Sequence, residues 1–196
     1  MDDKKRESLR ENDLRVRRTQ KALHDAIIAL LNQRNFNHIT VHDLCAAALI
    51  SRATFYAHFR DKYDLLGYLL SEIKERIVKD VYRYDELEEA VNQFICENKK
   101  LISHILKDAN SETLTLIRRF MSSIVELAIK RKISDEISPQ HTILFNFFIG
   151  GLVNLLTWIV ENDYPPEITM MNTYLYEMLE IVTVWDAEQG EMKTVP

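Results

Sequence analysis

The scarcity of helix-breaking residues is the feature that most restricts how this 196-residue chain can fold. No proline occurs before Pro139, and the chain contains only four glycines. Proline interrupts helices because it lacks a backbone N–H donor, and glycine weakens them because its backbone is the most flexible. Hardly any segment alternates polar and apolar residues with the period of two that marks a strand. The sequence therefore predicts an all-α protein.

Apolar periodicity and break points predict where the helices lie. From Arg15 to about Arg34, apolar residues recur at the i, i+3, i+4, i+7 spacing of one helix face. Ser138-Pro139 is a typical helix start, because proline suits the first helical position. The further helices are expected near residues 41–48, 52–59, 61–81, 86–106, 112–131, 139–161 and 168–186.

Three helix-start signals follow one another between Thr40 and Asp61. Thr40, with Asp43 three residues later, has the pattern of a capped helix start, and Ser51 and Asp61 are further N-cap candidates. Two helices of about eight residues are thus held between longer ones. Helices that short are unstable alone in water, so tertiary packing must hold them. The side chains expected to do so are Leu44, Phe55 and Phe59.

The segment Ser51–Arg60 has two chemically different faces when it is drawn as a helix. Phe55 and Phe59 mark the buried side, and the small residues Ala53 and Ala57 lie opposite them. Thr54, Tyr56, His58 and Arg60 flank this small centre. Such a face suits the DNA major groove, because it lets the backbone approach while polar neighbours reach base edges and phosphates.

The residues Arg17–Leu66 resemble the N-terminal DNA-binding domain of the TetR family of bacterial transcriptional regulators. The resemblance rests on Thr40-Val41, Asp43-Leu44, Ala48, Ile50-Ser51-Arg52, Thr54-Phe55-Tyr56, Phe59, Lys62 and Leu65. It implies a three-helix DNA-binding domain, a larger helical ligand-sensing domain, and a homodimer on a near-palindromic operator. The residues expected to face DNA are Arg17, Arg18, Thr40, Ser51, Arg52, Ala53, Thr54, Tyr56, His58 and Lys62.

Leu49 departs from the pattern of this family, which usually has glycine in the turn. A residue there tends toward positive φ, which costs energy for any residue with a Cβ. Either the turn has another shape or the strain is tolerated. The resemblance also suggests the domain limits: a charged tail at 1–14, the DNA-binding domain at 15–62, a sensing and dimerisation domain at 63–188, and a tail at 189–196.

The charge distribution agrees with DNA binding by the N-terminal part alone. The chain has a net charge of −5, yet residues 1–64 hold 12 Lys and Arg against 9 Asp and Glu. Residues 65–196 hold 13 against 21. A basic end on an acidic body indicates that only this end meets an anionic partner.

The segment 139–161 is apolar almost all round, which predicts a helix buried by several neighbours. Asn146, Gly150, Asn154, Thr157 and Glu161 form one small, polar arc on it. This arc could be a dimer seam or a wall of a ligand pocket, and the resemblance favours the seam. The partner stripe expected on the next helix consists of Met171, Leu175, Met178, Leu179 and Val182.

The sequence leaves three kinds of function to compare. The first is a homodimeric DNA-binding regulator, a repressor, released from its operator by a ligand in the C-terminal domain. The second is a regulator without a ligand, whose C-terminal domain docks a protein partner. The third is an enzyme, which the sequence disfavours because it has no glycine-rich phosphate loop and no Ser/His/Asp arrangement. The operator, the ligand and the regulated genes are not encoded in any motif.

No cofactor, metal or membrane association is expected. His38 and His42 have the spacing of a helical metal pair, but the cap at Thr40 separates them. Cys45 is expected to fill the core, and two unrelated cysteines indicate a reducing compartment. The charged first residues do not resemble a signal peptide. The expected location is the bacterial cytoplasm.

Overall fold

The computed structural model describes residues 3–79, 84–132 and 139–164. Within these ranges every regular element is helical, as predicted. The elements are α1 (Asp3–Leu31), the short 3-10 helix η1 (Phe36–His38), α2 (Val41–Ala48), α3 (Arg52–Tyr56), α4 (Lys62–Val78), α5 (Tyr84–Glu97), α6 (Lys99–Leu106), α7 (Ser111–Lys132) and α8 (Pro139–Glu161). The predicted helix 168–186 lies outside the described residues.

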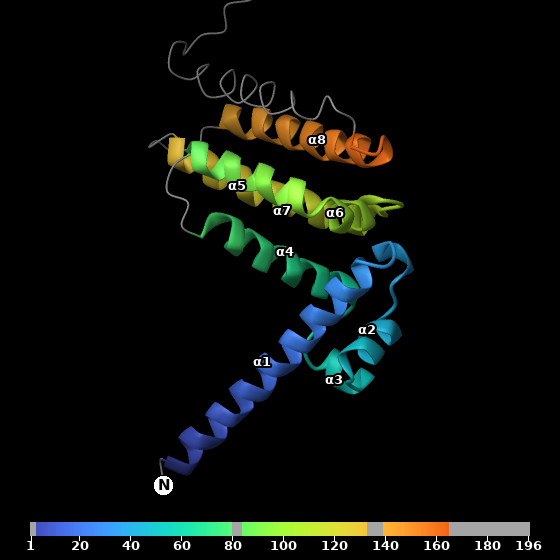
Figure 1. Ribbon diagram of the computed structural model, residues 1–196. Helices are drawn as coiled ribbons and strands as arrows, with labels where there is room; N and C mark the ends of the chain where they lie inside the picture. Colours follow the sequence, from blue (N-terminus) through green and yellow to red (C-terminus); the bar gives the residue numbers. More distant parts are fainter. Residues whose placement is uncertain (1–2, 80–83, 133–138, 165–196) are drawn as a thin grey trace, which may run out of the picture.

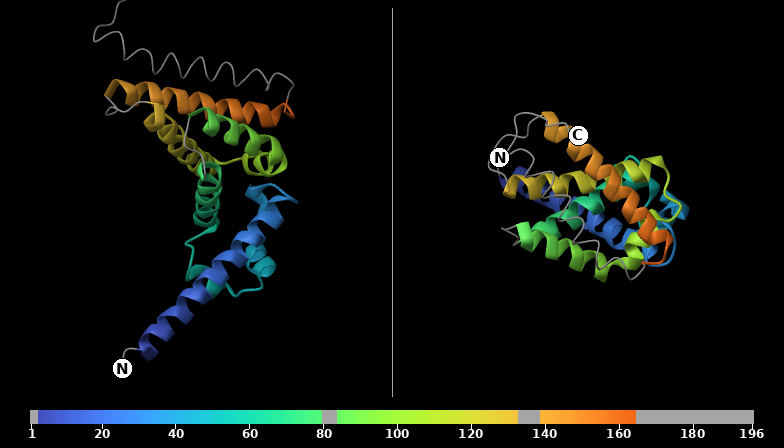
Figure 2. Two further views of the ribbon diagram at one scale, coloured as in Figure 1. Left: turned by 60° about the vertical axis from the view of Figure 1, so that its left-hand side comes forward. Right: turned by 90° about the horizontal axis from the view of Figure 1, so that it is seen from above.

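The helices form a head and a body joined by α4 (Figure 1). The head consists of α1, α2 and α3, and the body of α5 to α8. The left view of Figure 2 shows α4 between the head and the helices of the body. No helix in the described ranges is long and apolar enough to cross a membrane.

The core of the head holds the two short helices in place. Leu44 of α2 and Phe55 of α3 are fully buried, and Phe59 is 6% exposed, which confirms the predicted packing residues. Burying each such side chain contributes roughly 1.5–3 kcal/mol. The same core contains Leu23, Ile27, Leu31, Phe36, Ile39, Leu65, Leu66 and Leu69.

All three predicted N-caps are confirmed. The Thr40 hydroxyl accepts from the Asp43 N–H at 3.2 Å, and the Asp43 carboxylate accepts from the Thr40 N–H at 2.9 Å. The Ser51 hydroxyl accepts from the Thr54 N–H at 3.0 Å. Asp61 accepts from the Asp64 N–H at 2.8 Å. Each bond satisfies a backbone donor that a helix start leaves unpaired.

Three helix limits differ from the expectation. The helix α1 begins at Asp3, twelve residues before the predicted start, because Lys, Arg, Glu and Leu in this segment are strong helix formers. The expected helix 52–59 ends as a regular helix at Tyr56. The expected helix 86–106 is broken at Asn98, whose backbone leaves the helical region with φ −117° and ψ 25° and whose side chain donates to the Phe94 carbonyl at 2.9 Å. The proposed domain limits stay a prediction.

Leu49 adopts the strained turn geometry, with φ 55° and ψ 40° in the left-handed region. Its side chain is 92% exposed and gains no burial in return. The Ile50 N–H donates to the Cys45 carbonyl at 3.0 Å, which closes the end of α2. The turn therefore keeps a shape that suits glycine, and the leucine tolerates the strain.

Replacing Leu49 by glycine should stabilise the protein. The Leu49→Gly change relieves the left-handed strain and loses no buried contact, so the free energy of unfolding should rise by roughly 0.5–1 kcal/mol. Urea unfolding followed by circular dichroism measures the change. Leu49→Ala is the matched control, because alanine keeps the strain and should change little. A less stable glycine variant would contradict this account.

The carboxylate of Asp43 gives the N-terminal end of α2 a pH dependence. Hydrogen bonds from the Thr40 hydroxyl and backbone N–H, and then the Arg34 guanidinium, lower its pKa from the usual 3.8. A lowered folded-state pKa means that the carboxylate stabilises the fold above pH 3.8. This contribution is lost as the pH falls through the folded-state pKa.

The Asp43→Asn variant should test this contribution. At about pH 7 the substitution should lower the free energy of unfolding by about 1 kcal/mol, because it removes half of the capping box and a charge at the start of α2. The difference from wild type should shrink as the pH falls below about 4. Urea unfolding at both pH values measures it. Asp13→Asn, at an exposed position of α1, serves as a control, and an equal effect there would contradict the assignment.

Candidate nucleic-acid interface

The helix α3 presents the face that the sequence predicts for DNA. Ser51, Arg52, Ala53 and Tyr56 are exposed, whereas Phe55 lies in the core. Tyr56 is 58% exposed although its ring meets the edge of Phe55, with ring centroids 5.4 Å apart. This contact orients the phenol while leaving its hydroxyl accessible. The centre of the exposed face is small, and polar groups flank it.

The helical turn continues beyond the last regular residue of α3. The Ala57 N–H donates to Ala53 at 3.1 Å, and the Phe59 N–H donates to Phe55 at 2.9 Å. Thr54 and His58 are partly buried on the flank of the face. The Thr54 hydroxyl lies 2.8 Å from the Ser51 hydroxyl, so the cap of α3 also fixes the Thr54 rotamer.

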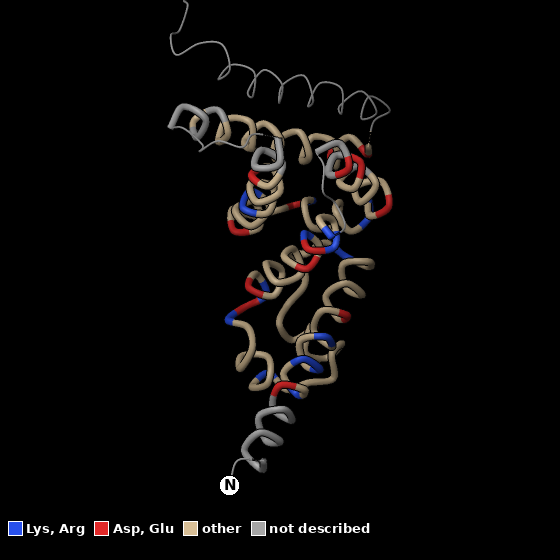
Figure 3. Tube along the Cα trace, turned by 90° about the vertical axis from the view of Figure 1, so that its left-hand side faces the viewer, with Lys and Arg blue, Asp and Glu red and all other residues tan. Residues whose placement is uncertain are grey.

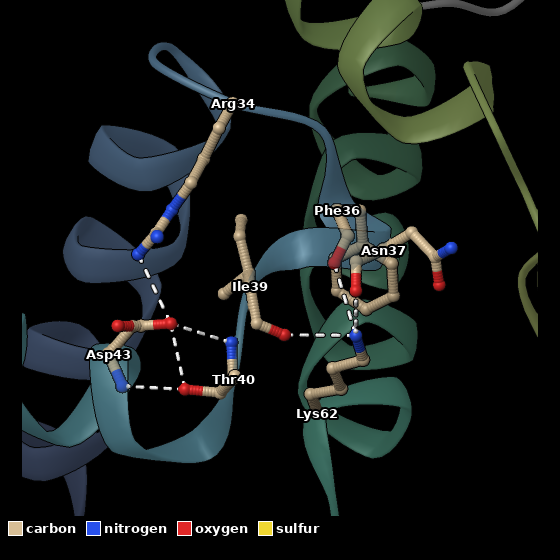
Figure 4. Close-up of polar contacts among 7 residues, drawn as sticks. All are labelled: Arg34, Phe36, Asn37, Ile39, Thr40, Asp43 and Lys62. Carbon is tan, nitrogen blue, oxygen red and sulfur yellow. Dashed lines mark hydrogen bonds and ion pairs between the residues drawn. The ribbon is translucent and has the colours of Figure 1, made fainter.

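The start of α2 is held by a compact polar cluster (Figure 4). The Thr40 hydroxyl donates to Asp43 at 2.7 Å while accepting from its N–H, and the Arg34 guanidinium lies 3.1 Å from the same carboxylate. The Thr40 proton is therefore engaged within the cap. A phosphate at this helix start would have to use the backbone N–H groups beside it.

Lys62, at the start of α4, is directed into the protein (Figure 4). Its ammonium group donates to the carbonyls of Phe36, Asn37 and Ile39 at 3.2, 3.0 and 2.9 Å. Burial lowers the pKa of Lys62, and the charge of Glu112 acts in the opposite direction. The sequence predicted a DNA contact for Lys62 and gave no signal for these three carbonyl partners. The DNA contact stays a prediction.

The remaining predicted cations lie on the surface of the head. Arg17 and Arg18 are exposed on α1. Figure 3 shows several Lys and Arg positions toward the lower end of the head. Arg60 is also exposed but pairs with Asp64 at 3.0 Å. This pair holds the pKa of Asp64 below its usual value and raises that of Arg60. The i, i+4 spacing of the pair was the available signal for it in the sequence.

Cys45, His38 and His42 lie in different surroundings. The Cys45 side chain is 4% exposed, which confirms it as a core residue, and burial raises the pKa of its thiol. His38 ends η1, and His42 lies on α2 beyond the Thr40 cap. Among the described residues no group of three or more possible metal ligands occurs.

An apolar cavity of about 60 Å³ lies inside the body. Helices α4, α5, α6, α7 and α8 line it, and every lining side chain is apolar, among them Ile77, Phe94, Ile105, Phe120 and Leu156. Ligand sites usually measure about 300–1,000 Å³ and contain a few polar groups. The cavity in this structure is thus small, and no polar group would orient an occupant.

A second hollow, of about 490 Å³, lies between the head and the body. It is lined by α1, α4 and the α5–α6 junction, and both apolar and charged side chains face it. At its edge His24 of α1 lies 3.2 Å from Glu72 of α4, whose carboxylate also accepts from the Tyr68 hydroxyl at 2.7 Å. This link between α1 and α4 had no local signal in the sequence, because its partners are far apart in the chain.

The described part of the predicted seam lies on α8. Asn146 and Asn154 are exposed, and Gly150 and Thr157 are partly buried. None of these four residues lines the apolar cavity, so that cavity gives no support to their reading as a pocket wall. The most exposed large apolar side chains of α8 are Ile143, Phe147 and Trp158, at 72%, 82% and 45%. The expected partner stripe (Met171, Leu175, Met178, Leu179 and Val182) lies outside the described residues.

Comparison with known proteins connects the head to a family. Residues 23–69 match the model of the family described as "Bacterial regulatory proteins, tetR family". A segment of 58 residues is 29% identical to the "Uncharacterized HTH-type transcriptional regulator YxbF" of Bacillus subtilis (strain 168). That match spans 30% of this chain and 15% of the relative.

Two solved structures share the fold over most of the chain. A TetR transcriptional regulator from Streptococcus agalactiae 2603V has a TM-score of 0.58 and 22% identity, and the match covers 85% of this chain and 98% of that one. The "Dihydroxyacetone kinase operon activator DhaS" has a TM-score of 0.52 and 17% identity, with coverage of 85% and 95%. At these identities the likeness concerns the fold.

The family match over residues 23–69 and the related regulator segment agree on a tetR-type DNA-binding domain in the head, and the solved structures share the helical fold of the chain.

Proposed function

We propose that this protein is a homodimeric repressor that binds a near-palindromic DNA operator with α3 and is released by a ligand bound in its body. The observation that carries the proposal is the exposed face of α3. Phe55 anchors this helix in the core, while Arg52, Ala53 and Tyr56 face solvent. A small centre with polar flanks suits a helix that lies in a major groove.

The distribution of charge along the chain also supports DNA as the partner. The net charge of residues 1–64 is positive although that of the whole chain is −5. Arg17, Arg18 and Arg52 are exposed on the head, and the structure gives them no ion-pair partner among the described residues. Free cations on one end of a molecule attract phosphates and release counterions on binding. An acidic body keeps the rest of the protein away from DNA.

Selection of bound duplexes from a randomised library tests the proposal. At about physiological salt, where non-specific phosphate binding is weak, the protein should enrich a near-palindrome whose half-sites are centred about one helical turn apart. No enrichment by folded, dimeric protein would contradict the proposal. A reporter gene under the enriched site then distinguishes repression from activation, which the fold does not decide.

Two variants of α3 should have different effects on the selected operator. Arg52→Met should weaken binding to all sequences and lower the slope of log K against log salt by about 0.9 per subunit, because one phosphate contact is lost. Thr54→Val removes a hydroxyl while keeping the shape, and should change the preference at particular base pairs. Salt titrations and a repeated selection measure the two effects. Both variants with the wild-type slope and preference would contradict the proposed interface.

A dimer is proposed through the exposed face of α8. Ile143, Phe147 and Trp158 lie on one stripe of this helix together with Gly151 and Asn154. A Cβ built on Gly151 meets nothing within 4 Å, so a partner helix could approach closely there. Exposed apolar stripes on soluble proteins commonly mark interaction surfaces. This stripe includes Asn154 of the seam predicted from the sequence and lies beside its other members.

Phe147→Asp should weaken the dimer. A carboxylate at this 82% exposed position would be buried without a partner in the interface, which is costly. Sedimentation velocity should show a shift toward monomer, and circular dichroism should show an unchanged helix content. Thr115→Asp, at an exposed position of α7, introduces the same charge and should leave the dimer intact. An unchanged dimer in both variants would place the interface elsewhere.

A second candidate function is a regulator whose body docks a protein partner and needs no small molecule. The observation in its favour is the small cavity of about 60 Å³ without any polar lining group. A ligand of ordinary size would have to enlarge it. Release of operator DNA by an apolar small molecule alone would rule this candidate out and support the first.

A further inference from the structure

The ammonium group of Lys62 is saturated by acceptors of its own chain. It has three protons and donates to the carbonyls of Phe36, Asn37 and Ile39, at 3.2, 3.0 and 2.9 Å. It also lies 4.9 Å from the ring centroid of Phe36 and 5.4 Å from that of Tyr63. Aromatic faces attract cations at such distances. These contacts form a cage, named here the Lys62 cage.

The three acceptor carbonyls lie at and just after the short helix η1. The short helix η1 ends at His38, and the carbonyls at the end of a helix lack helical partners and carry partial negative charge. Phe36 and Ile39 are buried, whereas Asn37 is exposed, so the ammonium group lies at the edge of the core. The Phe36 carbonyl also accepts from the Ile39 N–H at 3.0 Å, so the cage adds a second donor there and supplies a donor to the carbonyls of Asn37 and Ile39.

The cage joins two segments that both affect the DNA-binding face. On one side lies the link that leads through Ile39 into the capped start of α2. On the other side lies α4, which begins at Lys62 and continues to Val78 along the body. Figure 4 shows the link and α4 with Lys62 between them. The position of α2, against which α3 packs, is thus tied to α4 by this side chain.

We propose that Lys62 is a positioning residue that holds the η1–α2 link on α4, and that it does not neutralise a DNA phosphate. The proposal rests on the proposed DNA binding for its effect on the operator. To reach a phosphate, the ammonium group would have to give up three hydrogen bonds and two ring contacts. The head would lose the connection between the link and α4 at the same time.

Salt titrations of three variants on the selected operator distinguish the two roles. Lys62→Met removes the cation from an otherwise similar linear side chain. Affinity should fall several-fold while the slope of log K against log salt stays at the wild-type value. Arg52→Met, measured beside it, should lower that slope. If Lys62→Met lowers the slope by about 0.9 per subunit, Lys62 contacts a phosphate and the proposal is overturned.

The Lys62→Arg variant tests whether the ammonium geometry of the side chain is required. The planar guanidinium cannot direct three donors at the three carbonyls as an ammonium can, whereas it binds phosphate at least as well. This variant should therefore resemble Lys62→Met in affinity and keep the wild-type slope. Full wild-type affinity of Lys62→Arg would overturn the proposal.

The cage can also be tested without DNA. In wild-type protein, a proton–nitrogen correlation spectrum of lysine side chains should show a slowly exchanging ammonium signal with nuclear Overhauser contacts to the Phe36 and Tyr63 rings. A Lys62 ammonium that exchanges as fast as an exposed lysine would overturn the proposal. If no operator is enriched by wild type, the proposed function fails, and this spectrum still supports or overturns the cage on its own.

Discussion

The short helix α3 depends on an aromatic contact with α4. Phe55 and Phe59 of the α3 turn lie with their ring centroids 6.0 Å apart, and Phe59 meets Tyr68 of α4 at 5.6 Å. A regular helix of five residues has no stability of its own, so these side chains hold it. Because both phenylalanines point inward, the opposite face must point outward. The exposed face is thus a consequence of the buried one.

The same helix, α4, serves both parts of the molecule. Leu65, Leu66 and Leu69 pack into the core of the head, and further along Ile73 and Ile77 line the cavity of the body. A change in the cavity that shifts α4 would therefore also move the base on which α3 rests. The Lys62 cage and the His24–Glu72 contact connect α4 with the other segments of the head. Release of DNA by a ligand or a partner would act through these contacts, because an occupant can only favour a geometry that it binds better.

The turn between α2 and α3 carries backbone strain. Leu49 accepts a left-handed backbone at the end of α2, and its exposed side chain has no compensating contact. The turn nevertheless keeps the geometry that sets α3 against α2, because the Ile50 N–H closes the end of the helix. The departure from glycine is therefore expected to lower stability, while the hydrogen bond that closes the end of α2 is still made.

The sequence by itself determined the features that depend on neighbouring residues. The limits of α2, the caps at Thr40, Ser51 and Asp61, and the inward face of α3 all follow from side chains three or four positions apart. Such contacts form within one helical turn, so periodicity and spacing reveal them. The outward position of Arg52 and Tyr56 follows from the same periodicity.

Only the tertiary structure decided where the remaining polar groups find partners. The carbonyls around Lys62 lie 23 to 26 residues before it, and His24 meets Glu72 on another helix. No local pattern encodes such pairs, because they exist only after the apolar core has brought the helices together. The break at Asn98 and the strained backbone at Leu49 also depend on the tertiary structure. At each position the local backbone preference competes with the packing of the helices. A lysine that spacing alone assigns to a phosphate is thereby directed into the protein by the folded chain.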